Sequence, residues 1–416
     1  MAKNEATGLR KEEWSSRFNL IGEALLSDFT YRLDARSEKS DWVYNSLNLG
    51  VFCGEHFGNV YCELMGGYGS ERDNVIWVHG KNEDKTDDFS NSYTIAWEDR
   101  FDEDILKDIG ELCFIRVGLE RTDSNDVYVE KFLSPYDAIA HVNKHLEKGM
   151  VISVSGQLKY SVYNGSQQCK KEINSIMLAV DRKSKNKEAL PPEAYHAFWT
   201  QTMLLDRDSI TKDSFDKDKS AFLVEAYVLE KFKEFNGWDL TENGKIKGGQ
   251  LVPLKRTFEY VVGDTPEEKE RAKKVVAKLF KVKKDVTQVT FEGEFVESGA
   301  TVQTTIEDLP EEIRELIEYG IYSEEDALAR CSENTSKERR MIITRPVIKM
   351  VGEEGNKTAT IQRVDGKFKD TDLLLKCLSP REEKEEDVED DEVPFTEDET
   401  TETTESNEEQ DWLDLI

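Results

Sequence analysis

Several features that define large functional classes are missing from this sequence of 416 residues. It has no apolar run of about 18 residues or more, the length that a helix needs to cross a bilayer. Its beginning, MAKNEATGLR, has no apolar core like that of a secretory signal. We therefore expect a soluble, cytoplasmic protein that does not bind membranes.

The short motifs of common enzyme families are also absent. The sequence has no GxxxxGK[ST] phosphate loop, no GxGxxG after a strand, no HExxH and no GxSxG. A lysine in LVPLKRT, Lys255, has the chemistry of a nucleotidyl-transfer nucleophile, but no motif surrounds it. We therefore predict that the protein is not an enzyme and has no cofactor.

Cysteines are few and scattered, without a CxxC pair, which in a cytoplasmic protein indicates reduced and mostly buried thiols. One spacing is similar to a zinc site: Cys53, His56 and Cys62, with His79 as a candidate fourth ligand. Two further histidines are four residues apart on a predicted helix, but the sequence shows nothing that completes a site with them. They are His141 and His145. We predict that no metal is bound.

Basic residues are almost absent from the end of the sequence. From Arg381 to Ile416 there are 18 acidic and two basic residues, a net charge of −16 out of −30 for the whole chain. Such a segment cannot bury enough apolar surface to offset its chain entropy, so we expect residues 381–416 to be disordered. Large apolar residues nevertheless occupy its tip, DWLDLI.

Residues 15–181 combine strand patterns with one helix pattern. DWVYNSLNLGVFCGEHFGNVYCELMGGYG is rich in aromatic and aliphatic residues and is punctuated by Gly and Asn, as strands and hairpins are. A helix pattern covers 134–149, and MVISVSGQLKYSVYNGSQQCKKEINSIMLAV then alternates polar with apolar residues around an Asn-Gly turn. This order predicts an OB-fold, a five-stranded Greek-key barrel with its helix before the fourth strand.

The remaining chain repeats this order more loosely. We predict a connector over 182–217, in which AYHAFWTQTMLL forms a short helix. Residues 218–352 contain strand patterns, a helix that begins at Pro266, and an insert of two short helices, LPEEIRELIEYGIYSEEDALARC. A C-terminal extension covers 353–380. The predicted fold class is mainly β with α insertions: tandem OB-fold-like Greek-key barrels, followed by a disordered acidic tail.

Aromatic and basic residues are interleaved on the predicted strands of both barrels. Single-stranded nucleic acid needs both, because bases stack on aromatic faces at about 1–3 kcal/mol each while Lys and Arg follow the phosphates. Aromatic residues in a barrel are also commonly core residues, and the charge of −14 that residues 1–380 retain requires a basic groove to be local. The predicted contacts with single-stranded DNA are Trp42, Tyr44, Phe57, Tyr61, Lys159, Tyr163, Lys170, Lys171, Trp238, Lys255, Arg256 and Phe258.

One long stretch, YDAIAHVNKHLEKGMVISVSGQLKYSVYNGSQQCKKEINSIMLAV, resembles bacterial and phage single-stranded DNA-binding proteins. In that family a helix ending in Lys-Gly precedes a strand with a Val-x-Gly turn, a polar hairpin and a closing strand. The matching elements are Lys148-Gly149, Val154-Ser155-Gly156, Tyr163-Asn164-Gly165 and Ile173–Val180, and FNLIGEA is similar to the family's first strand. The resemblance covers 15–181 and implies an OB barrel that binds single-stranded DNA. The extra domain is more similar to a phage protein, which implies the cytoplasm of a host cell.

The resemblance also implies a role for the tail, because proteins of this family recruit replication and repair proteins through an acidic tail with an apolar tip. This chain has two such tips, DDEVPF and DWLDLI. We expect partners in DNA replication, recombination and repair to contact Val393, Pro394, Phe395, Asp411, Trp412, Leu413, Asp414, Leu415 and Ile416. The tail is also expected to compete with DNA for the basic groove at low salt.

Two other functions stay open. In the first, the barrels bind protein, and the chain is an acidic interaction or scaffold module without DNA binding. Alanine at both Trp42 and Tyr61 distinguishes the two hypotheses: it abolishes DNA binding if the chain binds DNA and only perturbs the fold otherwise. A third function, an enzyme of nucleic-acid metabolism, requires a divalent-metal-dependent site that the sequence does not offer.

Overall fold

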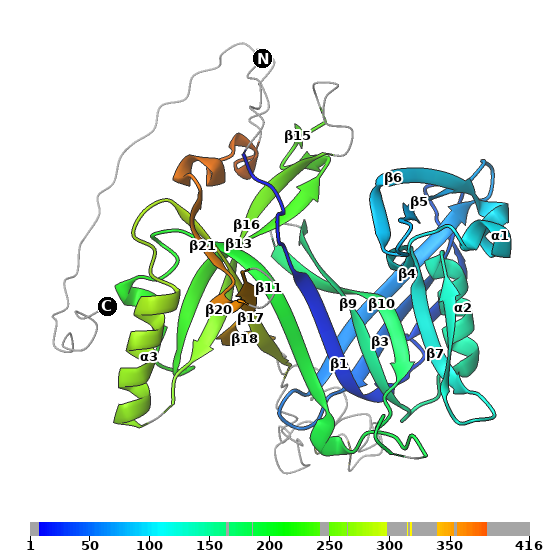
Figure 1. Cartoon of the computed structure of the whole chain (residues 1–416), viewed down its shortest axis with the longest axis horizontal. Coiled ribbons are helices and arrows are strands. Elements are labelled where there is room, and N and C mark those ends of the chain that lie inside the picture. The colour runs from blue at the N-terminus through cyan, green and yellow to red at the C-terminus, as the bar shows by residue number, and fades with distance from the viewer. Residues whose placement is uncertain are drawn as a thin grey trace. The chain divides into compact units, whose positions relative to one another are not determined.

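The computed structural model describes residues 8–163, 166–184, 186–241, 249–263, 265–297, 339–352 and 356–380, with the single residues 314 and 317 (Figure 1). The side chains of 163–167 lie outside this description, as do the predicted helical insert and the acidic tail. In the part of the chain that the structure describes, no helix combines the length and the apolar character needed to cross a bilayer.

The chain divides into two compact units, each built from separate stretches of sequence. The barrel unit consists of Ser15–Gln201 and Thr290–Val347. The second unit consists of Met1–Trp14, Thr202–Val289 and Ile348–Ile416. The sequence therefore leaves the barrel unit after residue 201 and returns to it at residue 290.

Five strands of the barrel unit form a closed barrel. Around the barrel their order is β1, β3, β4, β10 and β9, and β9 pairs with β1 to close the ring. All of these pairings are antiparallel except that of β4 with β10. The strands are β1 (Ser16–Leu25), β3 (Trp42–Phe52), β4 (Asn59–Gly69), β9 (Val151–Tyr163) and β10 (Ser166–Leu178).

Alternating side chains fill the inside of this barrel. Along β1, β3 and β9 every second residue is buried, as expected for strands with one face toward a core. Leu20, Leu49 and Val154 are fully buried representatives of the three strands. Two glycines allow strands to cross closely: a methyl group on Gly22 would lie 2.0 Å from the carbonyl oxygen of Phe52. On Gly156 it would lie 1.9 Å from that of Glu172.

The predicted helix before the fourth barrel strand is confirmed as α2 (Pro135–His145). Its N-cap, Ser134, accepts a hydrogen bond from the backbone N–H of Tyr136, and proline stands at the first helical position. The helix packs on β3, β4 and β7 (Figure 1). Its residues Ile139 and Val142 are fully buried. The helix ends at His145, four residues before the predicted stop at Gly149, with Leu146 as its C-cap.

Additional strands extend the barrel unit. β2 pairs with β3, β7 pairs with β10 and β8, and β11 pairs with β1. The hairpin β5–β6 and the short helix α1 lie around a small core of their own that includes Val78, Ile95 and Ile109. The bounds are β2 (Tyr31–Arg36), β5 (Val75–Lys81), β6 (Asp87–Ala96), α1 (Glu103–Leu106), β7 (Ile115–Arg121), β8 (Val127–Phe132) and β11 (His196–Leu205).

The prediction of a short helix in AYHAFWTQTMLL is wrong, because residues 196–205 form β11. The first half of this strand alternates buried Ala197 and Trp199 with more accessible Phe198 and Thr200. That period of two is a strand signal. β11 also lies inside the predicted connector 182–217, which therefore contains a strand of the barrel unit up to residue 201.

The second unit contains antiparallel strands and one long helix. β13 pairs with β12, β16 and β11, and the first residues of β17 pair with β21. Two short hairpins, β14–β15 and β19–β20, complete its described strands. The bounds are β12 (Phe215–Asp216), β13 (Ala221–Phe232), β14 (Glu234–Phe235), β15 (Trp238–Asp239), β16 (Gln250–Val261), β17 (Val286–Val296), β19 (Ile348–Val351), β20 (Thr358–Ile361) and β21 (Arg363–Phe368).

The helix predicted to begin at Pro266 is confirmed as α3 (Pro266–Leu279). Thr265 and Glu268 form a capping box at its start, which satisfies backbone N–H groups that a helix leaves unpaired. The remaining strand, β18 (Arg340–Pro346), pairs with the end of β17 in the barrel unit. The fold class is therefore mainly β with helical insertions and a closed five-stranded barrel, as predicted at that level.

Candidate nucleic-acid interface

The outer face of β3 presents two aromatic rings side by side. Trp42 and Tyr44 alternate with buried Val43 and Asn45, so both rings point away from the barrel core. Their centroids are 4.7 Å apart and their planes differ by 17°, which is a stacked arrangement. A flat aromatic pair of this kind is a surface on which a nucleobase can stack.

A basic residue lies next to this pair. Arg32, on β2, donates a hydrogen bond of 3.2 Å from Nη1 to the hydroxyl oxygen of Tyr44. On the other side, Gly67 of β4 is paired with Tyr44, and a methyl group there would lie only 2.8 Å from the Tyr44 Cβ. The sequence prediction identified the two aromatic residues but missed Arg32, which lies twelve positions from Tyr44 on a different strand.

The same outer face continues along β4. Met65 is paired with Ser46 and is 55% exposed, and Tyr61 is paired with Gly50 and is 37% exposed. Tyr61 is paired with Gly50, which lies eight positions after Trp42 on β3. At the usual rise per residue of a strand, eight positions correspond to about 27 Å. The candidate interface is thus a strip along β3 and β4, defined here by Arg32, Trp42, Tyr44, Tyr61 and Met65.

Lysines of the hairpin β9–β10 lie beside this strip. Lys159 and Lys170 are exposed and occupy paired positions across the hairpin. The Lys170 Nζ lies 2.9 Å from the Glu63 Oε1, and Glu63 stands between Tyr61 and Met65 on β4. Lys170, a predicted phosphate contact, is therefore neutralised by an acidic residue that lies between two residues of the strip. The side chain of Tyr163, also predicted here, lies outside the described residues.

The prediction that Lys171 contacts phosphate is wrong, because this side chain points into the barrel unit instead of toward solvent. Its residue is 8% exposed, its Nζ lies 2.7 Å from the Glu297 Oε1, and it stands 4.5 Å from the centroid of the Phe295 ring. It is paired with buried Leu158, whereas its neighbour Lys170 is paired with exposed Lys159. Successive strand residues face opposite sides, so the two lysines cannot share a role.

Phe57 belongs to a separate aromatic group in the turn before β4. Its ring meets those of His56 and Phe198 edge-on, at 4.7 and 5.9 Å between centroids. His196 stacks on Phe198 at 4.3 Å, and the Phe198 side chain is 45% exposed. The sequence prediction missed this group because it placed residues 196–205 in a helix, where 196 and 198 do not share a face.

The DNA contacts predicted in the second unit do not lie together on one accessible surface. Phe258 is a fully buried core residue, which contradicts its prediction as a stacking residue. The indole N–H of Trp238 donates a 3.0 Å hydrogen bond to the Ser379 carbonyl oxygen, so this ring is held by the C-terminal extension. Lys255 is exposed on β16 with its Nζ 3.9 Å from Glu225, and Arg256 is half-buried. These residues form no aromatic strip like that of β3.

The nine predicted partner-binding residues of the tail lie outside the described residues, so the structure does not address them. They are Val393, Pro394, Phe395, Asp411, Trp412, Leu413, Asp414, Leu415 and Ile416.

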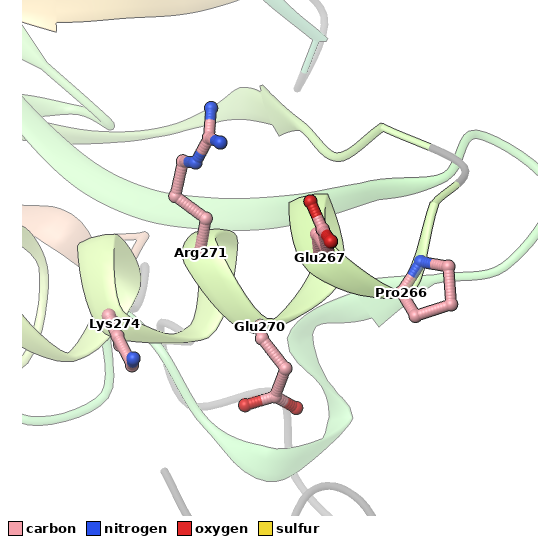
Figure 2. A pocket seen from close by; sticks show the side chains of 5 residues that line it. All are labelled: Pro266, Glu267, Glu270, Arg271 and Lys274. Carbon is pink, nitrogen blue, oxygen red and sulfur yellow. The ribbon is translucent and has the colours of Figure 1, made fainter.

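A hollow beside α3 does not fit nucleic acid. Figure 2 shows that its lining comes from successive turns of one helix, with acidic and basic side chains mixed. The lining residues are Pro266, Glu267, Glu270, Arg271 and Lys274. Because the charges are balanced and no aromatic ring is among them, this hollow offers neither a stacking surface nor a concentrated positive potential.

The zinc ligands weighed in the sequence are not brought together. Burial raises the pKa of both the Cys53 and Cys62 thiols, which opposes the thiolate form that binds zinc. His56 instead lies 3.1 Å from Glu294. His79 has other neighbours: its Nε2 is 2.7 Å from the Asp87 Oδ1 and its Nδ1 is 3.2 Å from the Cys113 sulfur.

The neighbours of His79 have the residue types of a nucleophilic triad, but their chemistry is that of a structural contact. Burial raises the pKa of the Cys113 thiol, which disfavours the nucleophilic thiolate. The carboxylate of Asp87 also accepts a 2.9 Å hydrogen bond from the Leu112 backbone N–H, the main cause of its lowered pKa. These contacts join the β5–β6 hairpin to residues 112–113.

Comparison with known proteins adds no identification. No protein-family model matches the chain, and no curated protein matches it significantly.

Proposed function

We propose that this protein binds single-stranded DNA without sequence preference and protects it during DNA replication and recombination, in the manner of phage single-stranded DNA-binding proteins. The observation that carries the proposal is the strip on β3 and β4, where the stacked Trp42 and Tyr44 lie beside Arg32. Stacking with aromatic rings accepts every base, and a guanidinium group accepts any phosphate, so this chemistry does not select a sequence.

The topology of the barrel supports this proposal. Among the five barrel strands, β3 and β4 are second and third along the chain, β9 and β10 are fourth and fifth, and α2 precedes the fourth. This is the element order of an OB-fold, in which strands two and three and the loop between strands four and five bind oligonucleotides. The proposal therefore assigns DNA binding to the aromatic strip on β3 and β4 and to Lys159 and Lys170 on the hairpin β9–β10.

We extend the proposal to a tandem arrangement, in which the second half of the chain forms a related barrel. The order along the chain is β11, β13 and β16, then α3, then β17 and β18, with only short strands between. This repeats the order of three strands, one helix and two strands in the first barrel. We assign the main DNA contact to the first barrel, because the aromatic strip lies there.

The acidic tail completes the proposed function. Its apolar tips supply anchors for replication and recombination proteins, and its charge of −16 opposes DNA binding at low salt. Both roles are inferred from the sequence and from its resemblance to single-stranded DNA-binding proteins.

The proposal is tested by titrating a fluorescent oligo(dT) with the full chain and following anisotropy at two salt concentrations. Wild-type protein should bind tightly and lose affinity as salt increases. The double variants W42A/Y44A and W42A/Y61A each remove two aromatic residues of the strip. At about 1–3 kcal/mol per stacked base, each should lower affinity by at least about 30-fold.

A matched control removes an exposed aromatic ring elsewhere. Trp77 is 74% exposed on β5, outside the barrel strands, so W77A should bind like wild type. Thermal unfolding of each variant separates lost binding from lost structure. If the wild type does not bind oligo(dT), the proposal is wrong and the protein-interaction module becomes the hypothesis to pursue. If folded W42A/Y44A binds normally, the strip is not the interface.

A further inference from the structure

Two histidines form a pair on one face of α2. His141 and His145 are one helical turn apart, and their rings are stacked with centroids 4.3 Å apart. Both side chains are half-buried where α2 packs on β7. Two imidazoles at this spacing are a common way for a helix to present two nitrogen ligands to one ion.

A carboxylate from β7 completes the group. The Glu120 Oε1 lies 3.3 Å from the His145 Nδ1, and its Oε2 lies 3.9 Å from the His141 Nε2. Zinc bonds of about 2.0–2.2 Å at tetrahedral angles place ligand atoms roughly 3.3–3.5 Å apart. One ligand atom from each of the three residues lies within 4.8 Å of the others. The 3.3 Å between Glu120 and His145 matches the required spacing, and the remaining ligand atoms must move closer by up to about 1.5 Å when an ion binds.

A second carboxylate stands behind the first histidine. The Glu130 Oε2, on β8, lies 3.3 Å from the His141 Nδ1. The two ring nitrogens of His141 therefore face two different carboxylates. A histidine ligand commonly has its other nitrogen next to a carboxylate, which fixes the tautomer and orients the ring. Glu130 is in that position.

We propose that Glu120, His141 and His145 bind a divalent transition-metal ion, with Zn²⁺ as the best match. Two imidazole nitrogens and one carboxylate oxygen suit zinc, and they leave a fourth position for solvent or an added ligand. The ion would join β7, which carries Glu120, to α2, which carries the two histidines. The sequence alone does not indicate this group, because Glu120 lies 21 residues before His141 and on a strand instead of the helix.

The competing interpretation is a cluster of ion pairs between protonated histidines and carboxylates, which needs no metal. The two are distinguished by titrating Zn²⁺ into the full chain after treatment with a chelator and dialysis. A chromogenic chelator present in the titration competes with weak carboxylate sites, including those of the acidic tail. The proposal predicts a single strong equivalent of Zn²⁺ per chain.

Variants then locate the site. H145A and E120Q each remove one ligand and should weaken Zn²⁺ binding by well over tenfold, whereas E130Q should weaken it by about 10–100-fold or less. H56A is a matched control, because His56 also faces a glutamate but without a second histidine. H79A tests the separate group in which His79 contacts Asp87 and Cys113. Both controls should bind Zn²⁺ like wild type.

Two further measurements of metal binding do not depend on competition with the chelator. Co²⁺ in place of Zn²⁺ should give visible absorption bands in the wild type that are absent in H145A, and Zn²⁺ should raise the melting temperature only of proteins with the intact site. The proposal is overturned if wild type binds no Zn²⁺ against the chelator, or if folded H145A and E120Q bind it as well as H56A does. Loss of binding in H79A alone would assign the ion elsewhere.

Discussion

At the scale of single residues, one acidic side chain limits the proposed DNA interface. Glu63 lies on β4 between Tyr61 and Met65, and its carboxylate holds the ammonium group of Lys170. A phosphate approaching this strip meets a negative charge and a lysine that is already paired. In the proposed interface, Glu63 thus lies between the aromatic rings of β4 and the lysine that is proposed to contact phosphate.

Glu63→Gln should therefore strengthen binding to oligo(dT). The substitution removes one negative charge from the strip and releases Lys170. Since exposed ion pairs contribute up to about 1 kcal/mol, the expected gain at low salt is about two- to fivefold. Fluorescence anisotropy measures it. Glu103→Gln, which makes the same charge change on exposed α1, is the control, and an equal gain there would show that only total charge matters.

The buried thiols give a prediction about alkaline pH. Burial raises the pKa of Cys62 from 9.0 to about 12, so this thiol stays protonated in the folded chain while it ionises in the unfolded one. The unfolded state then binds fewer protons, and the free energy of unfolding falls between pH 9 and 12 by up to about 1.4 kcal/mol per unit. Urea unfolding at pH 8 and pH 10 measures this loss. Cys62→Ala should lose less stability between the two values, and equal losses would contradict the prediction.

The sequence indicates which types of residue a DNA interface would use, but not which face of a strand each of them occupies. Of the residues predicted to contact DNA, Trp42, Tyr44 and Tyr61 are accessible, but Lys171 and Phe258 are buried. On a strand a change of one position reverses the face, so the position of the core must be known before a side chain can be placed. The spacing of His141 and His145 is visible in the sequence, but the carboxylates that face them come from two strands, β7 and β8.

At the scale of elements, α2 connects the barrel to the proposed metal site. The helix buries Ile139 and Val142 and presents His141 and His145 toward β7. Its beginning is set by Ser134, whose hydroxyl accepts the Tyr136 N–H at 3.1 Å.

Ser134→Ala should destabilise the protein by about 1 kcal/mol, the usual cost of an N-cap removed. The physical reason is that a backbone N–H at the start of α2 loses its acceptor. Chemical denaturation of the full chain measures the change. Ser134→Thr retains a hydroxyl at this position and should recover most of the loss, whereas equal destabilisation by both would indicate a packing effect.

Elements with local signals were predicted well. α2 and α3 each begin with a capping residue and a proline, and both helices are present at those positions. β11 was predicted wrongly because its aromatic residues also fit a helical spacing, and its pairing with β1 is not visible in the local sequence. The β5–β6 hairpin and its small core were not predicted, although β5 (VIWVHGK) begins with four apolar residues, because its partner β6 begins with the polar run DDFSNS.

At the scale of the whole molecule, the distribution of charge gives the clearest prediction. A chain ended after Pro380 lacks the segment that carries −16 of the total −30. Its affinity for oligo(dT) should exceed that of the full chain at low salt, and the two should converge as salt screens the tail. Anisotropy titrations over a salt series measure this.

A full-length variant separates the two proposed roles of the tail. W412A/L413A keeps every charge, so it should bind oligo(dT) like the wild type while losing partner proteins. If truncation leaves affinity unchanged at low ionic strength, the competition hypothesis is wrong.

The closed barrel could be predicted as a class but not as a set of pairings. Its strands are joined across large separations in sequence, as in the pairing of β1 with β9 and of β4 with β10. Local patterns specify which segments are strands, whereas closure depends on how the strands meet.

The division of the barrel unit over two stretches of sequence has a consequence for synthesis of the chain. Lys171 is buried against Glu297, which lies 126 residues later. At about 5–20 residues per second, a ribosome needs roughly 6–25 s to add those residues. During that interval the emerging barrel carries a lysine without its counter-charge. The barrel unit therefore reaches its final state only late in translation, after the intervening residues 202–289 have been made.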